Sequence, residues 1–154
     1  MLLIVSPCFI NMFDKATRQE NSKLLTSYVE RIMVRLFHGN RSKAGWNVFI
    51  LHTILIVVVY YLLLWSKSKN GFLIGLCLWI LLVLQHMYFD SCWGVKSERR
   101  IWRAKDWYGP WTSLFNLLHR YGMPPTKPYH NVFFIMFTII LGILAVERYI
   151  RFHR

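Results

Sequence analysis

Side chains that bind metals or take part in catalysis occur close together in residues 84–100, LQHMYFDSCWGVKSERR. His86 and Asp90 are four residues apart, so they would share one face of a helix. Imidazole, carboxylate and thiolate groups are the usual ligands of zinc and related metals. The candidates for a metal site or a histidine-ligated cofactor site are His52, His86, Asp90, Cys92 and His130.

The spacing of these residues favours a different role. The chain has no HExxH motif and no paired CxxC motif, and the templates for a nucleophile elbow, a P-loop or a GxGxxG turn do not occur. Polar residues of membrane helices commonly form hydrogen bonds between helices. We therefore predict that the chain is not an enzyme and holds no cofactor or metal. The metal site stays as the alternative, because ionisable residues inside a membrane often mark functional sites.

The composition indicates an integral membrane protein. The chain has 154 residues, of which 55% are hydrophobic and 17% aromatic, and its formal net charge is +12. A soluble domain of this size could not bury that much apolar surface. A nucleic-acid-binding protein would carry the charge without the long apolar runs, so we predict no nucleic-acid partner. The basic residues instead suit anionic lipid headgroups or an acidic partner.

Three apolar runs predict three transmembrane helices. Residues 46–65 form the first, twenty residues without a charged side chain, which span about 30 Å as a helix. Residues 71–89 form the second and 131–149 the third, for which a buried soluble helix is the alternative. Unpaired amides cannot face lipid, so the runs should be helical. The predicted class is all-α, with three transmembrane helices and interfacial amphipathic helices in a single membrane domain, 1–154.

The distribution of lysine and arginine predicts the topology. With three spans, residues before Trp46 and the 94–129 connection share one side and carry 14 basic residues, against 5 on the other side. The positive-inside rule then places the N-terminus in the cytosol, or in the matrix of an organelle. The connection between the first two spans, SKSKNG, is short enough to require an antiparallel hairpin.

Two amphipathic helices are predicted on the basic side. In the N-terminal segment 1–45, apolar pairs repeat every four residues and predict a helix over 23–38 that ends at Gly39. It would lie in the headgroup layer or pack on a partner. In the 94–129 connection, the spacing around Trp111 predicts a helix near 111–121, and the prolines of YGMPPTKPY predict an extended connector. The predicted lipid-interface residues are Trp46, Trp65, Arg31 and Arg35.

The basic side is also predicted to be the working surface, because two amphipathic helices and many aromatic residues lie on it. Aromatic residues and arginine are enriched in interface hot spots. The spans already anchor the chain, so extra lipid affinity would add little to its retention. The predicted partner-binding residues are Trp102, Trp107, Trp111, Arg99, Arg100 and Arg103.

The exit from the second span carries a short resemblance. Asp90-Ser-Cys92 is followed six residues after the cysteine by Glu98. This Cys-x5-Glu pattern after a transmembrane helix resembles small uncharacterised multi-pass membrane proteins of bacteria and large DNA viruses. The Ser or Thr usual at the midpoint is replaced by Val95. The resemblance covers about a tenth of the chain, carries no catalytic residue across, and makes a virion membrane a reasonable location.

The sequence therefore predicts a non-enzymatic multi-pass membrane protein, a structural or accessory subunit that links a membrane to a larger assembly. That membrane would belong to a virion or to an organelle, since accessory subunits of mitochondrial complexes share this composition. Two alternatives stay open. One is a subunit of an oligomeric channel or transporter, and the other is a membrane redox subunit that uses His52, His86 and His130.

Overall fold

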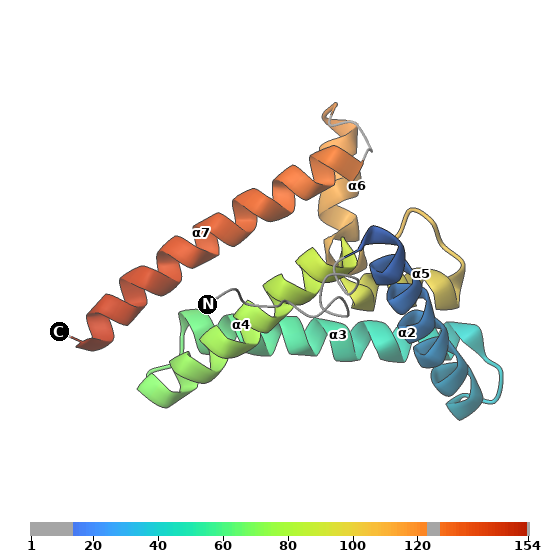
Figure 1. Ribbon diagram of the computed structural model, residues 1–154, viewed down its shortest axis with the longest axis horizontal. Helices are drawn as coiled ribbons and strands as arrows, with labels where there is room; N and C mark the ends of the chain where they lie inside the picture. The colour runs from blue at the N-terminus through green and yellow to red at the C-terminus, as the bar shows by residue number, and fades with distance from the viewer. Residues whose placement is uncertain (1–13, 123–126, 154) are drawn as a thin grey trace, which may run out of the picture. The chain divides into compact units, whose positions relative to one another are not determined.

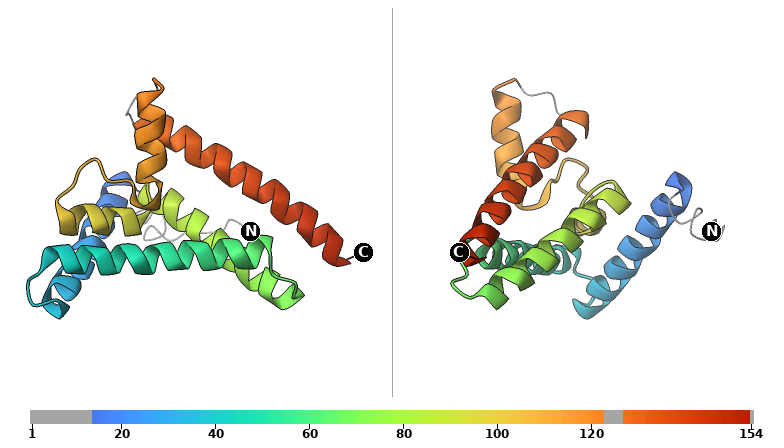
Figure 2. Two further views of the ribbon diagram at one scale, coloured as in Figure 1. Left: turned by 180° about the vertical axis from the view of Figure 1, so that it is seen from behind. Right: turned by 60° about the vertical axis from the view of Figure 1, so that its left-hand side comes forward.

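Every regular element in the described part of the chain is a helix (Figure 1, Figure 2). The computed structural model describes residues 14–122 and 127–153, except for the side chains of 127–130 and 153. Its elements are α2 (Lys15–Leu36), α3 (Arg41–Leu64), α4 (Lys69–Phe89), α5 (Trp93–Trp102), the 3-10 turn η1 (Gly109–Trp111), α6 (Thr112–Arg120) and α7 (Lys127–His153). The predicted all-α class is therefore confirmed.

Three of these helices are long and apolar enough to cross a membrane, as predicted. The stretches are Arg41–Leu64, Lys69–Phe89 and Asn131–Phe152. Only 11% to 17% of the residues in their apolar windows are buried inside the molecule. Many of their leucine, isoleucine and valine side chains stay exposed, and lipid is the environment in which such exposure costs no hydrophobic free energy. The composition is that of a multi-pass membrane protein.

The described residues form two compact units, and two of the three boundaries between them fall inside helices, α3 and α4. The first unit holds the described residues up to Leu51 together with Leu84–Trp107. The second unit holds His52–Val83 and the described residues from Tyr108 onward. α3 and α4 therefore each contribute one part of their length to each unit.

In the second unit, α3 and α4 form the hairpin that the short connection predicts. The helices approach closely at Gly75, where an added Cβ atom would lie 2.7 Å from the backbone nitrogen of Leu63. Small residues permit such close contact between membrane helices. Phe72, Leu63 and Ala145 are buried together and form the core beside this contact.

Arg148 of α7 binds the C-terminal end of α3. Its Nη1 donates a hydrogen bond to the carbonyl of Leu63 at 2.7 Å, and its Nη2 donates to the carbonyl of Ser66. The last carbonyls of a helix lack intrahelical donors, and a cation is favourable at that negative end. The guanidinium also lies over the rings of Phe72 and Phe152, 5.7 and 5.4 Å from their centroids. Arg148 thus satisfies the end of α3 and fixes α7 to it.

The start of α7 packs against η1 and α6 in the same unit. The Trp111 ring contacts the rings of Phe133 and Phe137, with centroids 6.0 and 5.1 Å apart. Phe115 of α6 is fully buried and packs on Phe133. The amphipathic helix predicted near 111–121 is therefore confirmed as α6, with its apolar face on the third span.

Two parts of the predicted 94–129 connection differ in the structure. Residues 93–102 form a helix, α5, where the sequence analysis expects only a basic and aromatic connection. The extended connector is wrong for residues 127–129, which belong to α7. Pro128 is tolerated there because the first amides of a helix have no intrahelical acceptor. Residues 123–126 lie outside the described residues.

α2 begins eight residues before the predicted start at residue 23. The Asp14 side chain caps it by accepting hydrogen bonds from the amides of Ala16 and Thr17 at 3.0 and 3.4 Å. At the other end, the amide of His38 donates to the Arg35 carbonyl and that of Gly39 donates to the Val34 carbonyl. His38 and Gly39 both have positive φ, +51° and +82°. This is a Schellman motif, which ends the helix at the predicted place.

We expect Arg148→Gln to lower the free energy of unfolding by about 2 kcal/mol. A hydrogen bond from a charged donor contributes about 1.5–3 kcal/mol, and partial exposure of the two bonds of Arg148 to solvent reduces their sum. The control is Arg151→Gln, which removes an exposed i, i+4 pair with Glu147 worth about 0.5 kcal/mol or less. Chemical unfolding in mild detergent, followed by circular dichroism, measures both. Equal stability of the two variants would show that Arg148 does not hold the end of α3.

Candidate functional site

The first unit contains a small core where α2 and α5, which lie outside the three spans, meet the first turns of α3. Ala44, Val48 and Ile101 are buried at its centre. The partly buried side chains packed around them are Val29, Met33, Val34 and Phe37. We call this region, residues 15–49 and 93–107, the basic platform.

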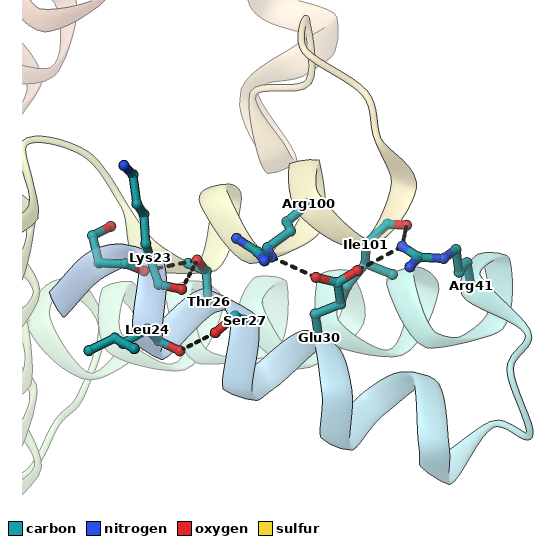
Figure 3. Close-up of polar contacts among 9 residues, drawn as sticks. Lys23, Leu24, Thr26, Ser27, Glu30, Arg41, Arg100 and Ile101 are labelled. Atoms are coloured by element: carbon teal, nitrogen blue, oxygen red, sulfur yellow. Dashed lines mark hydrogen bonds and ion pairs between the residues drawn. The ribbon is translucent and has the colours of Figure 1, made fainter. Parts of the chain in front are cut away.

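A cluster of three charged residues joins the helices of the platform (Figure 3). Glu30 of α2 lies between two guanidinium groups, with Arg41 of α3 at 2.8 Å and Arg100 of α5 at 2.6 Å. Arg41 also donates to the carbonyl of Ile101 at 3.3 Å. Burial alone would raise the pKa of Glu30, but the hydrogen bonds and charges of Arg100 and Arg41 outweigh it, so the pKa lies below its ordinary value. The carboxylate therefore stays ionised at neutral pH.

Four aromatic rings pack where the platform meets the start of the first span. Trp102 contacts the rings of Trp46 and Trp107, with centroids 5.5 and 4.7 Å apart. Phe49 contacts Trp107 at 5.5 Å. An added Cβ atom on Gly45 would overlap the indole of Trp102, so the glycine makes room for this ring. We call these four rings the aromatic cluster.

A fully buried carboxylate lies next to the aromatic cluster. Glu98 has no solvent exposure, and its Oε2 accepts a hydrogen bond from the indole of Trp107. The carbonyl of Trp107 in turn accepts a hydrogen bond from Nε of Arg99. An unpaired buried carboxylate would be costly, so Glu98 and Arg99 together fix the segment that follows α5.

The end of α4 is also held by cations of the platform. Arg18 of α2 donates to the carbonyls of Met87 and Tyr88, each at 3.4 Å. Lys96 of α5 donates to the carbonyl of Phe89 at 2.6 Å. These are carbonyls of the last turn of α4, which need external donors. Arg18 and Lys96 therefore stabilise the place where the second span ends.

The candidates for the alternative metal or cofactor site form no group that could hold a metal ion in the described part of the chain. Among those residues, no three histidine, cysteine, aspartate or glutamate side chains lie close enough to hold a metal ion. Asp90 and Cys92 lie in the turn between α4 and α5, with φ of +53° at Asp90 and Cys92 at the N-cap of α5. Gln85 donates to the carbonyl of Ser91 at 3.2 Å, which shapes this turn. The side chain of His130 lies outside the described residues.

The residues predicted to bind a partner are mostly engaged inside the molecule. Trp102 and Trp107 belong to the aromatic cluster, and Arg100 is paired with Glu30. Trp111 packs on α7 in the second unit. Arg103 is exposed and ends α5 with φ of +56°. The structure thus gives these side chains a packing role, and their contact with a partner stays a prediction.

The exposed apolar surface of the platform lies on α2. The structure divides the apolar face predicted for this helix into two strips. Val29, Met33 and Phe37 pack into the core. The other strip, which we call the open row, consists of Leu24, Leu25, Tyr28, Ile32 and Leu36, each 36–65% exposed. Exposed apolar patches of this kind mark contact with a protein or a membrane.

The predicted lipid-interface residues are all exposed. Trp46 and Trp65 lie near the two ends of the first span, with exposed fractions of 52% and 65%. Arg31 and Arg35 lie on α2, one helical turn apart and next to the open row. Their placement suits the interface, and their contact with lipid stays a prediction.

We expect Glu30→Gln to lower the free energy of unfolding by roughly 1–2 kcal/mol at neutral pH, because two charge-assisted hydrogen bonds are weakened. The pKa of Glu30 is lower in the folded state than its ordinary 4.5. Its contribution is therefore complete above that value and disappears as the pH falls through the lowered pKa.

Chemical unfolding of the full-length protein in detergent, measured at neutral pH and at pH values below 4.5, checks this expectation. The matched control is Glu20→Gln on the same helix, an exposed carboxylate that makes no ion pair among the described residues. The destabilisation by Glu30→Gln should shrink in acid, whereas Glu20→Gln should have little effect. A Glu30→Gln effect that is independent of pH would contradict the ion-pair explanation.

The Cys-x5-Glu pattern begins at the N-cap of α5 and ends inside that helix. Cys92 is the N-cap residue of α5, and Glu98 is the buried acceptor of the Trp107 indole. Both residues therefore have structural positions at the exit of the second span. No family model, curated protein or solved structure matches this chain.

Proposed function

We propose that the chain is a non-enzymatic structural or accessory subunit that links a membrane to a larger assembly, in a virion or an organelle. The observation that supports this best is the basic platform, in which α2 and α5, both outside the candidate spans, fold on the first turns of α3 and leave an open row on their surface. Anchoring in a bilayer requires only the spans. A platform with its own core, ion pairs and aromatic cluster is suited to holding a second molecule in a fixed position.

The occupant that the open row suits best is a protein. Four of its five residues, Leu24, Tyr28, Ile32 and Leu36, repeat every fourth position, over about 18 Å of helix. This is the spacing at which an amphipathic helix is recognised by an apolar groove or a second helix. Tyr28 adds an aromatic side chain of a type enriched in interface hot spots. Anionic lipid would be the secondary contact of the platform.

The platform is proposed to face the cytosol, or the matrix of an organelle. The proposal rests on the excess of basic residues on that side, 14 against 5, under the positive-inside rule. The arrangement of the second unit is compatible with it, because Arg148 brings the end of α7 to the end of α3. The C-terminal end of α7 and the α3–α4 turn would then share the opposite side.

Replacing Tyr28 and Ile32 together by serine should release the protein partner without unfolding the platform. Both side chains are exposed and lie outside the platform core, and surface substitutions of this kind usually change stability by no more than about 0.5 kcal/mol. The measurement is the quantity of each protein that co-purifies with the full-length chain after mild detergent extraction.

The matched control is Leu117→Ser with Tyr121→Ser, which removes two exposed apolar side chains near α6, 50% and 83% exposed. The control should keep every partner of the unsubstituted protein. If the Tyr28 and Ile32 variant also keeps every partner, the open row is not the docking surface.

The topology can be tested with two exposed lysines. We expect Lys67→Cys, in the α3–α4 turn, and Lys105→Cys, after α5, to react with an impermeant thiol reagent from opposite sides of the sealed membrane, with Lys105→Cys reacting from the cytosolic or matrix side. The measurement uses isolated membranes sealed in a known orientation and labelled before and after permeabilisation, and the unsubstituted protein gives the background from its own cysteines. Reaction of Lys67→Cys from the cytosolic or matrix side with protection of Lys105→Cys would reverse the proposed orientation, and equal reaction of both before permeabilisation would contradict the three-span arrangement.

A further inference from the structure

An open hollow of about 380 Å³ lies where α2 ends and α3 begins. Its lining residues are Glu30, Arg31, Val34, Arg35, Gly39 and Arg41. Three of these carry a positive charge and one carries a negative charge. The carboxylate of Glu30 is already bound by Arg41 and by Arg100. The hollow therefore presents a surplus of positive charge, and its volume is within the range of about 300–1,000 Å³ typical of small-ligand sites.

Two of the arginines have no anionic partner within the described residues. Arg31 and Arg35 are exposed, and neither guanidinium makes a hydrogen bond or ion pair there. They are four positions apart on one helix, a spacing at which like charges repel and destabilise the helix. An anion held between them and Arg41 would relieve this repulsion and could accept several hydrogen bonds, since guanidinium groups match the geometry of phosphate oxygens.

The position of the hollow along the first span identifies the source of that anion. Arg41 is the first residue of α3, which is a candidate span. Trp46, the predicted interface residue, follows five positions later, about 7.5 Å along the helix axis. The hollow then lies outside the hydrocarbon core at the depth of lipid headgroups. It also adjoins the N-terminal turn of α3, whose dipole favours an anion.

We propose that this hollow binds the phosphate of one anionic phospholipid headgroup, through Arg31, Arg35 and Arg41. The lipid fixes the elbow between α2 and α3 and thereby the orientation of α2 at the membrane surface. Glu30 keeps Arg41 directed toward the hollow. The inference depends on insertion of the spans into a membrane and does not depend on the protein partner proposed for the open row.

The test uses the full-length protein reconstituted in nanodiscs of phosphatidylcholine with a minority of phosphatidylglycerol. Native mass spectrometry then measures how much phosphatidylglycerol each chain retains after release into detergent. The variant is Arg31→Gln with Arg35→Gln, and the matched control is Lys23→Gln with Lys105→Gln, which removes two exposed charges of the platform away from the hollow. Circular dichroism confirms that both variants are folded.

We expect the wild type and the control to retain one phosphatidylglycerol per chain. The Arg31 and Arg35 variant should bind it about 25-fold more weakly, because each of the two basic residues near an anionic headgroup contributes about fivefold in affinity. Equal retention by both variants would overturn the proposal in favour of unspecific surface charge. Displacement of the lipid by millimolar inorganic phosphate would overturn the lipid as the source. A co-purifying acidic protein, lost only in the Arg31 and Arg35 variant, would also overturn it.

Discussion

The constraint on which this structure most depends is the need to supply donors to the carbonyls at the C-terminal ends of the spans. Water does this for an exposed helix, but a span ends near lipid, where an unsatisfied carbonyl is costly. In the second unit Arg148 donates to the end of α3. In the first unit Arg18 and Lys96 donate to the end of α4. Each of these cations comes from a different helix, so satisfying a helix end also fixes two helices together.

This use of cations gives part of the high net charge a structural meaning. The chain has 19 lysine and arginine residues and only 7 acidic ones, so few cations can find a carboxylate. Backbone carbonyls accept the hydrogen bonds of Arg148 and Arg18 in the described part of the chain, where carboxylates would otherwise serve. Glu30 instead pairs with two arginines at once and joins three helices. Arg31 and Arg35 have no such acceptor within the described residues, and both are therefore available for an external anion.

The sequence predicted the elements whose signal is long and apolar, and it missed the element whose signal is short and polar. The three spans follow from continuous apolar runs, and α6 follows from apolar periodicity. α5 was not predicted from the sequence, because only one of the residues that it buries is large and apolar. These residues are Gly94, Ser97, Glu98 and Ile101. The start of α2 was predicted too late in the sequence, because its first two turns carry no apolar stripe. The only sign of the true start is the capping residue Asp14, which is a local signal. The division of the α2 face depends on where α5 lies, which no local pattern contains.

The tryptophans show why composition did not settle which residues face a partner. Large aromatic side chains and arginine are favoured at interfaces because they bury much area and make many hydrogen bonds. The same two properties also allow them to pack the inside of the platform. Trp46 and Phe49 belong to the first span, whereas Trp102 and Trp107 come from the far end of the platform sequence. The aromatic cluster therefore packs the platform directly on the first turns of a membrane helix. A force applied to α2 would be transmitted to α3 through Glu30 and the aromatic cluster rather than through a flexible linker. A link between a membrane and an assembly requires this rigid connection.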